Sequence, residues 1–328
     1  MDIMQRFLFE ELDIRGSLVQ LGPAWRSLCK VHSYAPETRA LLGELAAVTA
    51  LIGGNLKTPG RLRFQLRGQG PVSLLMMDCD EQLRLRGMAR GVARMSPTTQ
   101  GDNQGFGGGA TADITPPTAI SPSATARRAP FARPPCSAVG SSASTFSAHD
   151  LLGDGQLLLT LQTAAAEPYQ SLVPNDGDSM AEIFEHYLAQ SEQQPSRLWL
   201  MADAYHACGL FLQKLPDADL RDADGWRRIA QLAATVHPAE LTLPPESLLN
   251  RLFHEETIRL FSPRAVTWHC PRDEEKIRNL LLTMGRDEVM EILAERGEIA
   301  ITDEICGHEY RFGPEILDEL FPPARLLH

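Results

Sequence analysis

The residues with the clearest capacity for chemistry are two of the six cysteines. Cys270 is flanked by His269, with Arg272 two residues further on, and cationic neighbours of this kind can depress the pKa of a thiol. A thiol oxidoreductase that uses Cys270 and Cys306 is therefore one hypothesis for the function. No CxxC or CxC spacing occurs, and in a chain of this length an even number of cysteines does not by itself indicate disulfides.

Other residue patterns that could do chemistry are incomplete. His254 and Glu255 begin like the metalloprotease motif HExxH, but Ile258 stands where the second histidine is required. No GxSxG occurs, and His186 and His237 are single imidazoles. Glycines near residue 105 are not followed by the GK[ST] of a phosphate loop. The chain is therefore not predicted to be an enzyme, and the sequence contexts of Cys29 and Cys208 predict buried, inert thiols.

Length and composition limit the class of protein. The chain has 328 residues, 43% of them hydrophobic and 22% charged, so it can bury a core of one to two domains. Its formal net charge of -11 makes nucleic acid an unexpected partner. No apolar run is long enough to span a membrane, and acidic residues stand where a signal peptide needs basic ones, so a cytoplasmic protein is expected.

The periodicity of apolar residues predicts the elements. A helix begins at Pro36 and ends before Gly53, and a second helix starts at Ser179 and Glu182, which form a capping-box pattern. Later helices are expected near residues 225–236, 244–256, 277–281 and 289–293, the last capped by Gly297. Strands are expected near residues 14–19, 61–68, 70–78, 83–91, 155–163, 168–174, 197–202 and 208–215, with a hairpin ending near 313.

The order of these elements, strands first and helices later, favours an α+β fold. We expect a mixed sheet-and-helix core domain over residues 1–216, a helical linker over 217–260 and a small C-terminal module over 261–328. Residues 97–148 are rich in Gly, Pro, Ser, Thr and Ala and show no hydrophobic period, which predicts a disordered insertion. This insertion could serve as the docking tail of a scaffold protein, a third hypothesis for the function.

Several segments in order resemble the thirty-three-kilodalton redox-regulated heat-shock chaperone family of bacteria. They are RFLFEELDIRG, LLGELAAVTALIGGNLKTPGRLRFQLRGQGPVSLLMMD, RGMARG, YLAQSEQQPSRLWL, LLNRLFHEETIRLF and ICGHEYRF. The resemblance implies a holdase, a chaperone that binds unfolding proteins without ATP under oxidative or heat stress. It also implies a C-terminal switch in which a CxC and a CxxC pair hold zinc, and whose oxidation forms two disulfides, releases the metal and unfolds switch and linker.

The sequence departs from the resembled pattern at the switch. Cys270 and Cys306 are retained, but Arg272 and Asp303 stand where the two other thiols are expected. A structural zinc site takes four ligands, so zinc is doubtful here and would need at best Cys270 and Cys306 with His308. Neighbouring side chains in extended backbone point to opposite faces, which argues against His269 as a further ligand.

Three alternatives to the zinc switch stay open at the level of sequence. Because the counterparts of Cys270 and Cys306 share one metal in the resembled family, a single reversible disulfide between them is one. An ion pair between Arg272 and Asp303 is the second, and would contribute little if exposed. If this ion pair replaces the metal site, heat or acid would activate the chaperone. The third is a holdase that binds its clients constitutively, without redox control.

Binding of unfolded clients requires apolar surface, which the sequence places on strands and on linker helices. Each of these residues could equally belong to a core, so we expect the linker-helix residues to become exposed only on activation. The resemblance also implies a homodimer when active. The client-binding candidates are Leu62, Phe64, Leu66, Leu74, Leu75, Trp226, Leu249 and Phe253.

Overall fold

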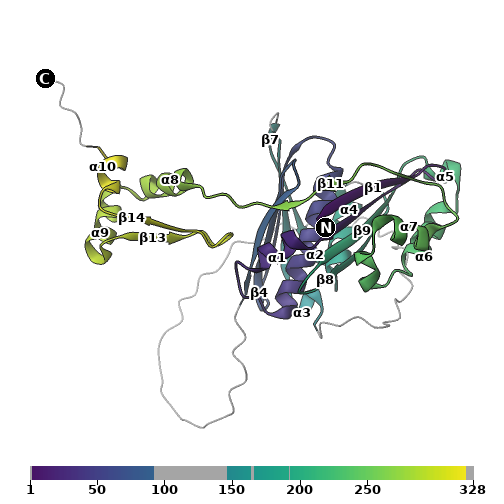
Figure 1. The fold of residues 1–328 in the computed structure, drawn as a ribbon, viewed down its shortest axis with the longest axis horizontal. Helices are drawn as coiled ribbons and strands as arrows, with labels where there is room; N and C mark the ends of the chain where they lie inside the picture. Colours follow the sequence, from purple (N-terminus) through teal and green to yellow (C-terminus); the bar gives the residue numbers. More distant parts are fainter. Residues whose placement is uncertain (1, 92–145, 164–165, 192, 323–328) are drawn as a thin grey trace, which may run out of the picture. The chain divides into compact units, whose positions relative to one another are not determined.

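The computed structural model describes residues 2–91, 146–163, 166–191 and 193–322 (Figure 1). The insertion predicted at residues 97–148 lies almost entirely outside them. The described part is built from two six-stranded sheets, a two-stranded hairpin and helices, so the α+β class is confirmed. None of the described helices combines the length and the apolar character needed to cross a membrane.

The first sheet is antiparallel and has the strand order β10-β1-β2-β9-β8, with β11 also paired to β1. Its long strands meet in full register, for example Leu18 of β2 opposite Leu210 of β9. Asp13, in the left-handed region at φ 52°, lies in the turn between β1 and β2. The strands are β1 Ile3–Phe9, β2 Ile14–Leu21, β8 Ser196–Ala202, β9 Ala207–Lys214, β10 Ile258–Leu260 and β11 Arg264–Ala265.

The second sheet has the strand order β12-β5-β4-β3-β6-β7. All of its pairs are antiparallel except the short edge pair of β12 with β5. Strand β5 pairs with β4, and β6 pairs with β3 on the other side of the same sheet. The undescribed residues 92–145 lie between β5 and β6 in the sequence. The strands are β3 Gly60–Gly68, β4 Val72–Cys79, β5 Arg84–Gly91, β6 Gly155–Thr163, β7 Ala166–Pro174 and β12 Thr267–Trp268.

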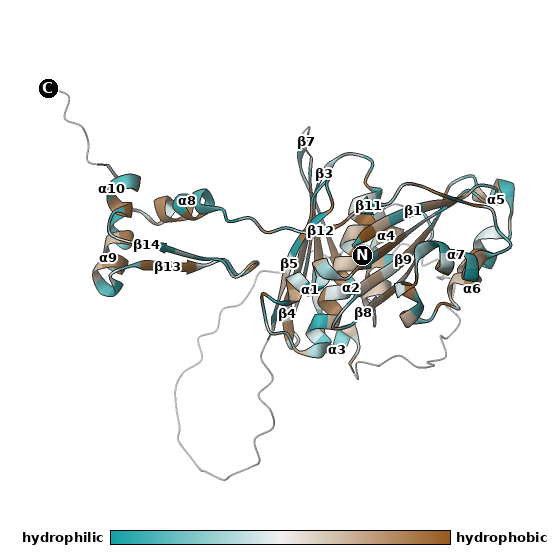
Figure 2. Ribbon diagram, in the orientation of Figure 1, coloured by the Kyte–Doolittle hydropathy of each residue, from teal (hydrophilic) through white to brown (hydrophobic). Residues whose placement is uncertain are grey.

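Helix α2, Pro36–Asn55, lies between the two sheets and contacts strands of both. It is buried along most of its length, as expected for a helix that is apolar on nearly all sides (Figure 2). Gly43 allows α2 to approach β8 closely, because a Cβ at this position would lie 2.5 Å from Cβ of Ala202 at the end of β8. Helix α4, Met180–Ser191, packs on the same core. Helices α1, Pro23–Cys29, and α3, Ala148–Leu152, are shorter.

The predicted linker region consists of short helices packed on the other face of the first sheet. They are α5 Ala218–Arg221, α6 Gly225–Ala233, the 3-10 helix η1 Pro238–Thr242 and α7 Pro245–Phe253. Apolar residues of β1, β2 and β9 form a continuous cluster with those of α6, η1 and α7. The first sheet is therefore covered by α2 on one face and by the linker helices on the other.

The C-terminal module contains two helices, a hairpin and a last short helix. The elements are α8 Glu274–Met284, α9 Arg286–Arg296, β13 Ile299–Thr302, β14 Glu309–Phe312 and α10 Ile316–Leu320. Asp273 caps α8 by accepting a hydrogen bond from Lys276 N at 3.0 Å, and Gly297 ends α9 at φ 76° as predicted. The module has its own apolar core of Ile277, Leu281, Val289, Leu293, Ile299, Tyr310, Phe312 and Ile316.

Candidate functional site

The two cysteines that the resemblance assigns to the switch, Cys270 and Cys306, come from the end of the second sheet and from the C-terminal hairpin. Cys270 lies two residues after the end of β12, and the N–H of the intervening His269 donates to Leu85 O of β5 at 2.9 Å. Cys306 lies in the turn between β13 and β14, close enough to Cys270 to raise the pKa of that thiol. Both side chains are buried and both thiols are free. The structure thus brings together a residue at the edge of the second sheet and a residue of the C-terminal hairpin.

The ionisation of Cys270 differs from the expectation. Burial, and next the hydrogen bond to Cys306, raise its pKa to about 12, whereas an oxidoreductase nucleophile needs a depressed pKa. The flanking His269 that suggested activation is exposed, whereas Cys270 is buried. The oxidoreductase hypothesis therefore loses the feature on which it rested.

The hairpin turn that holds Cys306 is tightly fixed. Gly307 N donates to Asp303 O at 2.7 Å, and Asp303 N donates to His308 O at 2.9 Å. Gly307 has φ 67°, in the left-handed region where a residue with a side chain would be strained. This turn places His308 Nδ1 3.4 Å from Cys306 Sγ, so the imidazole contacts one thiol of the pair.

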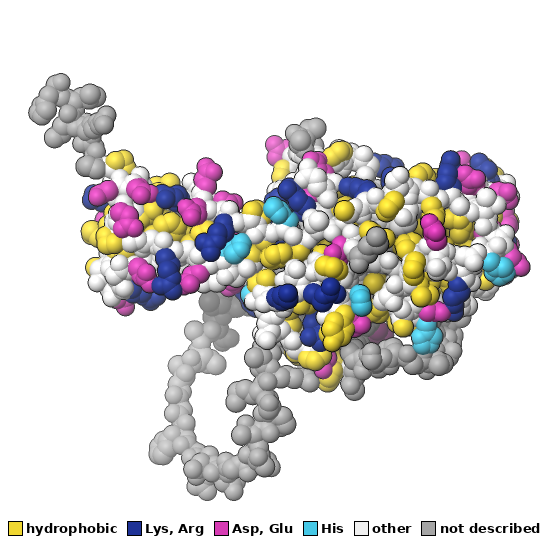
Figure 3. All heavy atoms as spheres, viewed as in Figure 1, with side chains coloured by type: hydrophobic (Ala, Val, Ile, Leu, Met, Phe, Trp, Pro, Cys, Tyr) yellow, Lys and Arg dark blue, Asp and Glu magenta, His cyan; other side chains and the backbone are white. Residues whose placement is uncertain are grey.

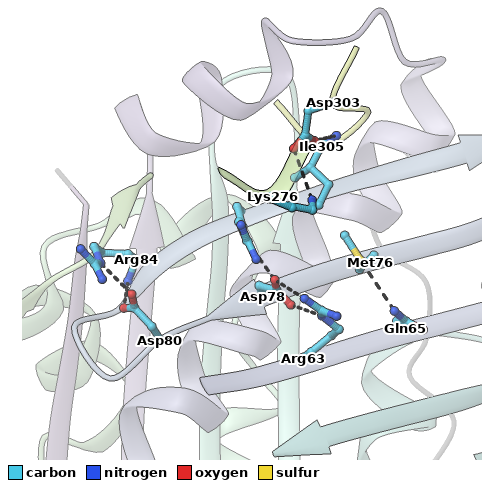
Figure 4. Close-up of polar contacts among 10 residues, drawn as sticks. Arg63, Gln65, Met76, Asp78, Asp80, Arg84, Lys276, Asp303 and Ile305 are labelled. Carbon is cyan, nitrogen blue, oxygen red and sulfur yellow. Dashed lines mark hydrogen bonds and ion pairs between the residues drawn. The ribbon is translucent and has the colours of Figure 1, made fainter. Parts of the chain in front are cut away.

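The residues at the two lost thiol positions have other partners. Asp303 Oδ1 accepts a hydrogen bond from Ile305 N at 2.8 Å, and its Oδ2 lies 3.7 Å from Lys276 Nζ (Figure 4). Arg272 lies over the ring of Tyr310, 5.9 Å from its centroid. In place of the Arg272–Asp303 ion pair, which was one of the alternatives left open by the sequence, the structure has an Asp303–Lys276 pair and an Arg272–Tyr310 cation–π contact.

The turn also contacts the core domain. The Glu304 carboxylate pairs with Arg90 of β5, and Glu304 O lies 2.6 Å from His32 Nε2. No sequence pattern pointed to these contacts, because a glutamate in a turn and an arginine at a strand end are common and lie far apart in the chain. The same holds for Tyr310, whose hydroxyl accepts a hydrogen bond from Asp273 N at 2.8 Å.

The linker-helix candidates for client binding lie in the cluster under α6 and α7. Leu249 and Phe253 are buried and Trp226 is half-buried. The ring of Phe253 packs edge-on against Phe9 of β1, with centroids 5.0 Å apart. Around this cluster, Arg228 pairs with Glu256 and Asp222, and Gln20 Nε2 donates to Leu241 O at 2.8 Å.

The strand candidates lie elsewhere. Leu62, Phe64, Leu66 and Leu75 are buried in the core around α2, where Phe64 packs against Phe184 of α4 at 4.8 Å between centroids. Leu74 is half-buried. On the face drawn in Figure 3, apolar side chains are interspersed with charged ones. The two large apolar clusters are therefore interior in this state, and client binding by any of these residues requires a part of the chain to open.

The structure is consistent with the expectation that Cys29 and Cys208 are unreactive thiols, and Cys79 resembles them. Burial raises the pKa of Cys79 and Cys208 to about 12 and that of the half-buried Cys29 to about 11. Cys136 lies outside the described residues.

The chain is similar to a known family of proteins over almost its whole length. The family model described as "Hsp33 protein" matches residues 2–313. The chain is 36% identical to the 33 kDa chaperonin of Nitrosococcus oceani, covering 98% of this chain and 94% of that protein. It is 30% identical to the 33 kDa chaperonin of Vibrio cholerae, with coverages of 98% and 96%.

The chain belongs to the Hsp33 family. Its fold agrees with this, since the crystal structure of the 33 kDa chaperonin from Thermotoga maritima superimposes with a TM-score of 0.74 at 18% identity and covers 98% of both chains. The chain is accordingly a chaperone, and the Hsp33 relatives are chaperones rather than enzymes.

The zinc centre that the resemblance implies can be tested against the donor set of this chain. Among the residues that the structure describes, no group of three or more His, Cys, Asp or Glu side chains is placed to hold a metal ion. Two thiols and one imidazole are close, but Asp303 is turned to Ile305 N and Lys276, and Arg272 supplies a cation where a ligand is needed. The residues do not fit a structural zinc site.

Proposed function

We propose that this Hsp33-family chain is a holdase that binds unfolding proteins without ATP during heat or oxidative stress. The observation that carries the proposal is the apolar cluster between the first sheet and helices α6, η1 and α7. Fifteen buried apolar residues contribute to it, among them Phe7, Phe9, Leu210, Leu249 and Phe253. A chaperone of this kind needs apolar surface that is hidden when it rests and available when clients unfold.

The linker helices are suited to detach. Helices α6 and α7 have nine residues each, and helices this short are marginal in water unless they pack on something. The sheet beneath them is held independently by α2, which covers its other face. Release of the linker helices would therefore uncover the apolar residues of β1, β2 and β9 while the core keeps its fold.

The strand residues Leu62, Phe64, Leu66 and Leu75 are secondary candidates for client binding. Their exposure would require α2 to leave the sheet, and α2 is the central helix of the core. We therefore assign first contact with clients to Trp226, Leu249 and Phe253 together with the strand face beneath them.

The division of labour that we propose follows the elements. Residues 1–216 form the client-binding core, 217–260 the detachable linker and 261–328 the control module. We also propose that the chain acts in the cytoplasm, where thiols are kept reduced. We further propose that the active form is a homodimer, because the apolar face uncovered on a single chain could pair with its copy.

Suppression of client aggregation tests the proposal. Light scattering of a heat-unfolded client protein is followed with and without the full chain, in the absence of ATP, at ambient and at heat-shock temperature. We expect scattering to fall in proportion to added chain at the higher temperature. If scattering is unchanged at every ratio and temperature, with or without peroxide, the holdase function is wrong.

A further inference from the structure

We propose that the outer edge of strand β7 binds a short extended segment of an unfolding client by strand addition, and that it prefers apolar segments with basic residues at their ends. The inference deepens the proposed function and rests on it for the identity of the partner as a client. The binding itself can be measured with a peptide, without any client.

Strand β7 is the last strand of the second sheet (Figure 1). It pairs with β6 from Tyr169 opposite Leu161 to Pro174 opposite Gln156. Among the described residues, no strand lies on its other side. An edge strand presents unpaired backbone N–H and C=O groups, to which another extended chain can hydrogen-bond. The described part of the chain therefore leaves a position for one more strand next to β7.

A hydrogen bond just after the end of β7 determines which backbone groups face outward. Asn175 N donates to Gly155 O at 3.0 Å, and these two residues continue the register of β7 with β6. In an antiparallel pair, every second residue bonds to the neighbouring strand, and the residues between them point their N–H and C=O groups away from it. The outward-pointing residues of β7 therefore include Gln170 and Leu172.

The pairing on the other side of β6 gives the same assignment. Gln69 N donates to Asp154 O at 3.2 Å, in the register of β3 with β6. Even-numbered residues of β6 thus bond to β3 and odd-numbered residues bond to β7. Because Leu158 bonds to β3, the residue opposite it on β7, Leu172, does not bond to β6.

Prolines limit the length of the segment that can pair with this edge. Pro174 is an outward-pointing residue at one end of β7, and Pro168 precedes Tyr169 beside the bulge at the other end. Neither proline has an N–H to donate, although their carbonyls can still accept. Within β7, the outward donors are therefore those of Gln170 and Leu172. This edge fits a short segment that supplies N–H groups of its own.

The side chains beside these donors are apolar and exposed. Leu172 is 59% exposed and Tyr169 is 56% exposed. Leu172 lies opposite the half-buried Leu158. The neighbours of this pair on the other face of the sheet, Val173 and Leu157, are buried in the core around α2. A client strand would place one of its own side chains against Leu172, and apolar cross-strand contacts of this kind stabilise a sheet.

The charges around the edge determine which segments fit it. Exposed Glu167 lies near one end of β7 and exposed Asp176 lies just beyond the other end. The sequence of β7 contains no Lys or Arg. Basic residues at the two ends of a bound segment would face these carboxylates, and opposite charges on neighbouring strands attract.

A second copy of this chain is a poor partner for the same edge. The antiparallel register that uses the outward donors of both copies pairs Gln170 of one copy with Leu172 of the other. This register places proline opposite proline at both ends of the ladder and brings Glu167 of one copy beside the acidic Asp176 of the other. A client segment without proline and with basic ends avoids both costs.

Binding of a labelled heptapeptide, Lys-Val-Thr-Val-Thr-Val-Lys, to the full chain at ambient temperature tests the inference. Amide exchange measured by NMR is expected to show Tyr169, Ser171 and Val173 protected in the free chain. Gln170 and Leu172 are expected to gain protection only when the peptide is bound, while α6 and α7 keep theirs.

Two outcomes of this experiment would overturn the inference. One is the absence of peptide binding, or binding that leaves the amides of Gln170 and Leu172 unprotected. The other is protection of these amides in the free chain that is lost on dilution, which would assign the edge to a second copy.

Matched variants test the edge donor. Q170P removes an outward N–H and leaves the bonds to β6 in place. It is expected to weaken peptide binding by about tenfold, which corresponds to the loss of one to two hydrogen bonds. Q170T keeps the N–H at the same exposed position and is the control, with the affinity of the wild type. Equal peptide affinities of Q170P and Q170T would overturn strand addition.

A charge reversal tests the assigned peptide chemistry. At low ionic strength, E167K is expected to bind the Lys-ended peptide more weakly than the wild type does and to bind a Glu-ended peptide of the same core more tightly. An unchanged preference between the two peptides would overturn the assignment of basic ends.

Client assays separate this inference from the holdase proposal. If the peptide binds as expected but no heat-unfolded client is protected, strand addition stands and the holdase proposal fails. If wild type and Q170P protect clients equally while the peptide does not bind, the holdase proposal stands and this inference fails.

Discussion

At the scale of single residues, the buried carboxylate of Asp78 connects three strands of the second sheet. No sequence pattern predicted this role. The Asp78 side chain of β4 is 3% exposed and accepts hydrogen bonds from Arg63 Nε at 2.5 Å, Arg63 Nη2 at 2.9 Å and Arg86 Nε at 2.9 Å (Figure 4). The hydrogen bonds from Arg63 raise the pKa of its guanidinium. The three residues are directly opposite one another on β3, β4 and β5.

Replacing this carboxylate should weaken the fold. D78N is expected to lower the free energy of unfolding by about 2 kcal/mol, the scale of lost charge-assisted hydrogen bonds, since both arginines can still reach water. Urea unfolding measures the change. D217N, at an exposed position without a side-chain cap bond, is the control and should change stability little. A loss for D78N no larger than that of the control would contradict the assigned role.

The side-chain partners around the two cysteines could be predicted from the sequence only in part. The resemblance predicts that Cys270, Cys306, Arg272 and Asp303 occupy the four switch positions, and this stays a prediction. It did not predict Lys276 as the partner of Asp303, because that choice depends on how α8 packs against the hairpin. The pKa of Cys270 was expected in the wrong direction, since burial outweighs the effect of neighbours in sequence.

At the scale of elements, strong periodicity predicted structure well. Helix α2, strands β3 to β6, and α6 and α7 all lie where apolar spacing placed them. Strands β10, β11 and β12 have only two or three residues each and no period of their own. They form because their backbones pair with the free edge of a longer strand, β1 for β10 and β11 and β5 for β12. Such elements depend on tertiary pairing, which local sequence does not encode.

Weakening one linker helix should lower the threshold for activation. F253A removes a ring packed against Phe9 and is expected to cost about 3–5 kcal/mol of α7 docking. Client protection should then begin at a lower temperature than in the wild type, while the loss of a client-contact side chain lowers the amount of client bound per chain. L220A, which removes a side chain that is 85% exposed in the same segment, is the control. An unchanged threshold in F253A, despite faster exchange of α7 amides, would show that docking of α7 does not mask the client surface.

At the scale of the whole molecule, our account gives one apolar surface of the described part of the chain two purposes. The outer face of the first sheet binds the linker helices at rest, and in our account it binds clients when they leave. The family and the α+β fold could be predicted from the sequence, because six segments in order are hard to obtain by chance. The way in which the chain is controlled could not be predicted, because Arg272 and Asp303 stand where the resemblance expects thiols.

Hydrogen exchange of the full chain during heating tests the central claim most directly. Amides of α6 and α7 are followed together with those of α2, which reports on the core. The account predicts that α6 and α7 lose protection together at the temperature where client protection begins, while α2 stays protected. Equal protection of all three helices up to global unfolding would contradict it.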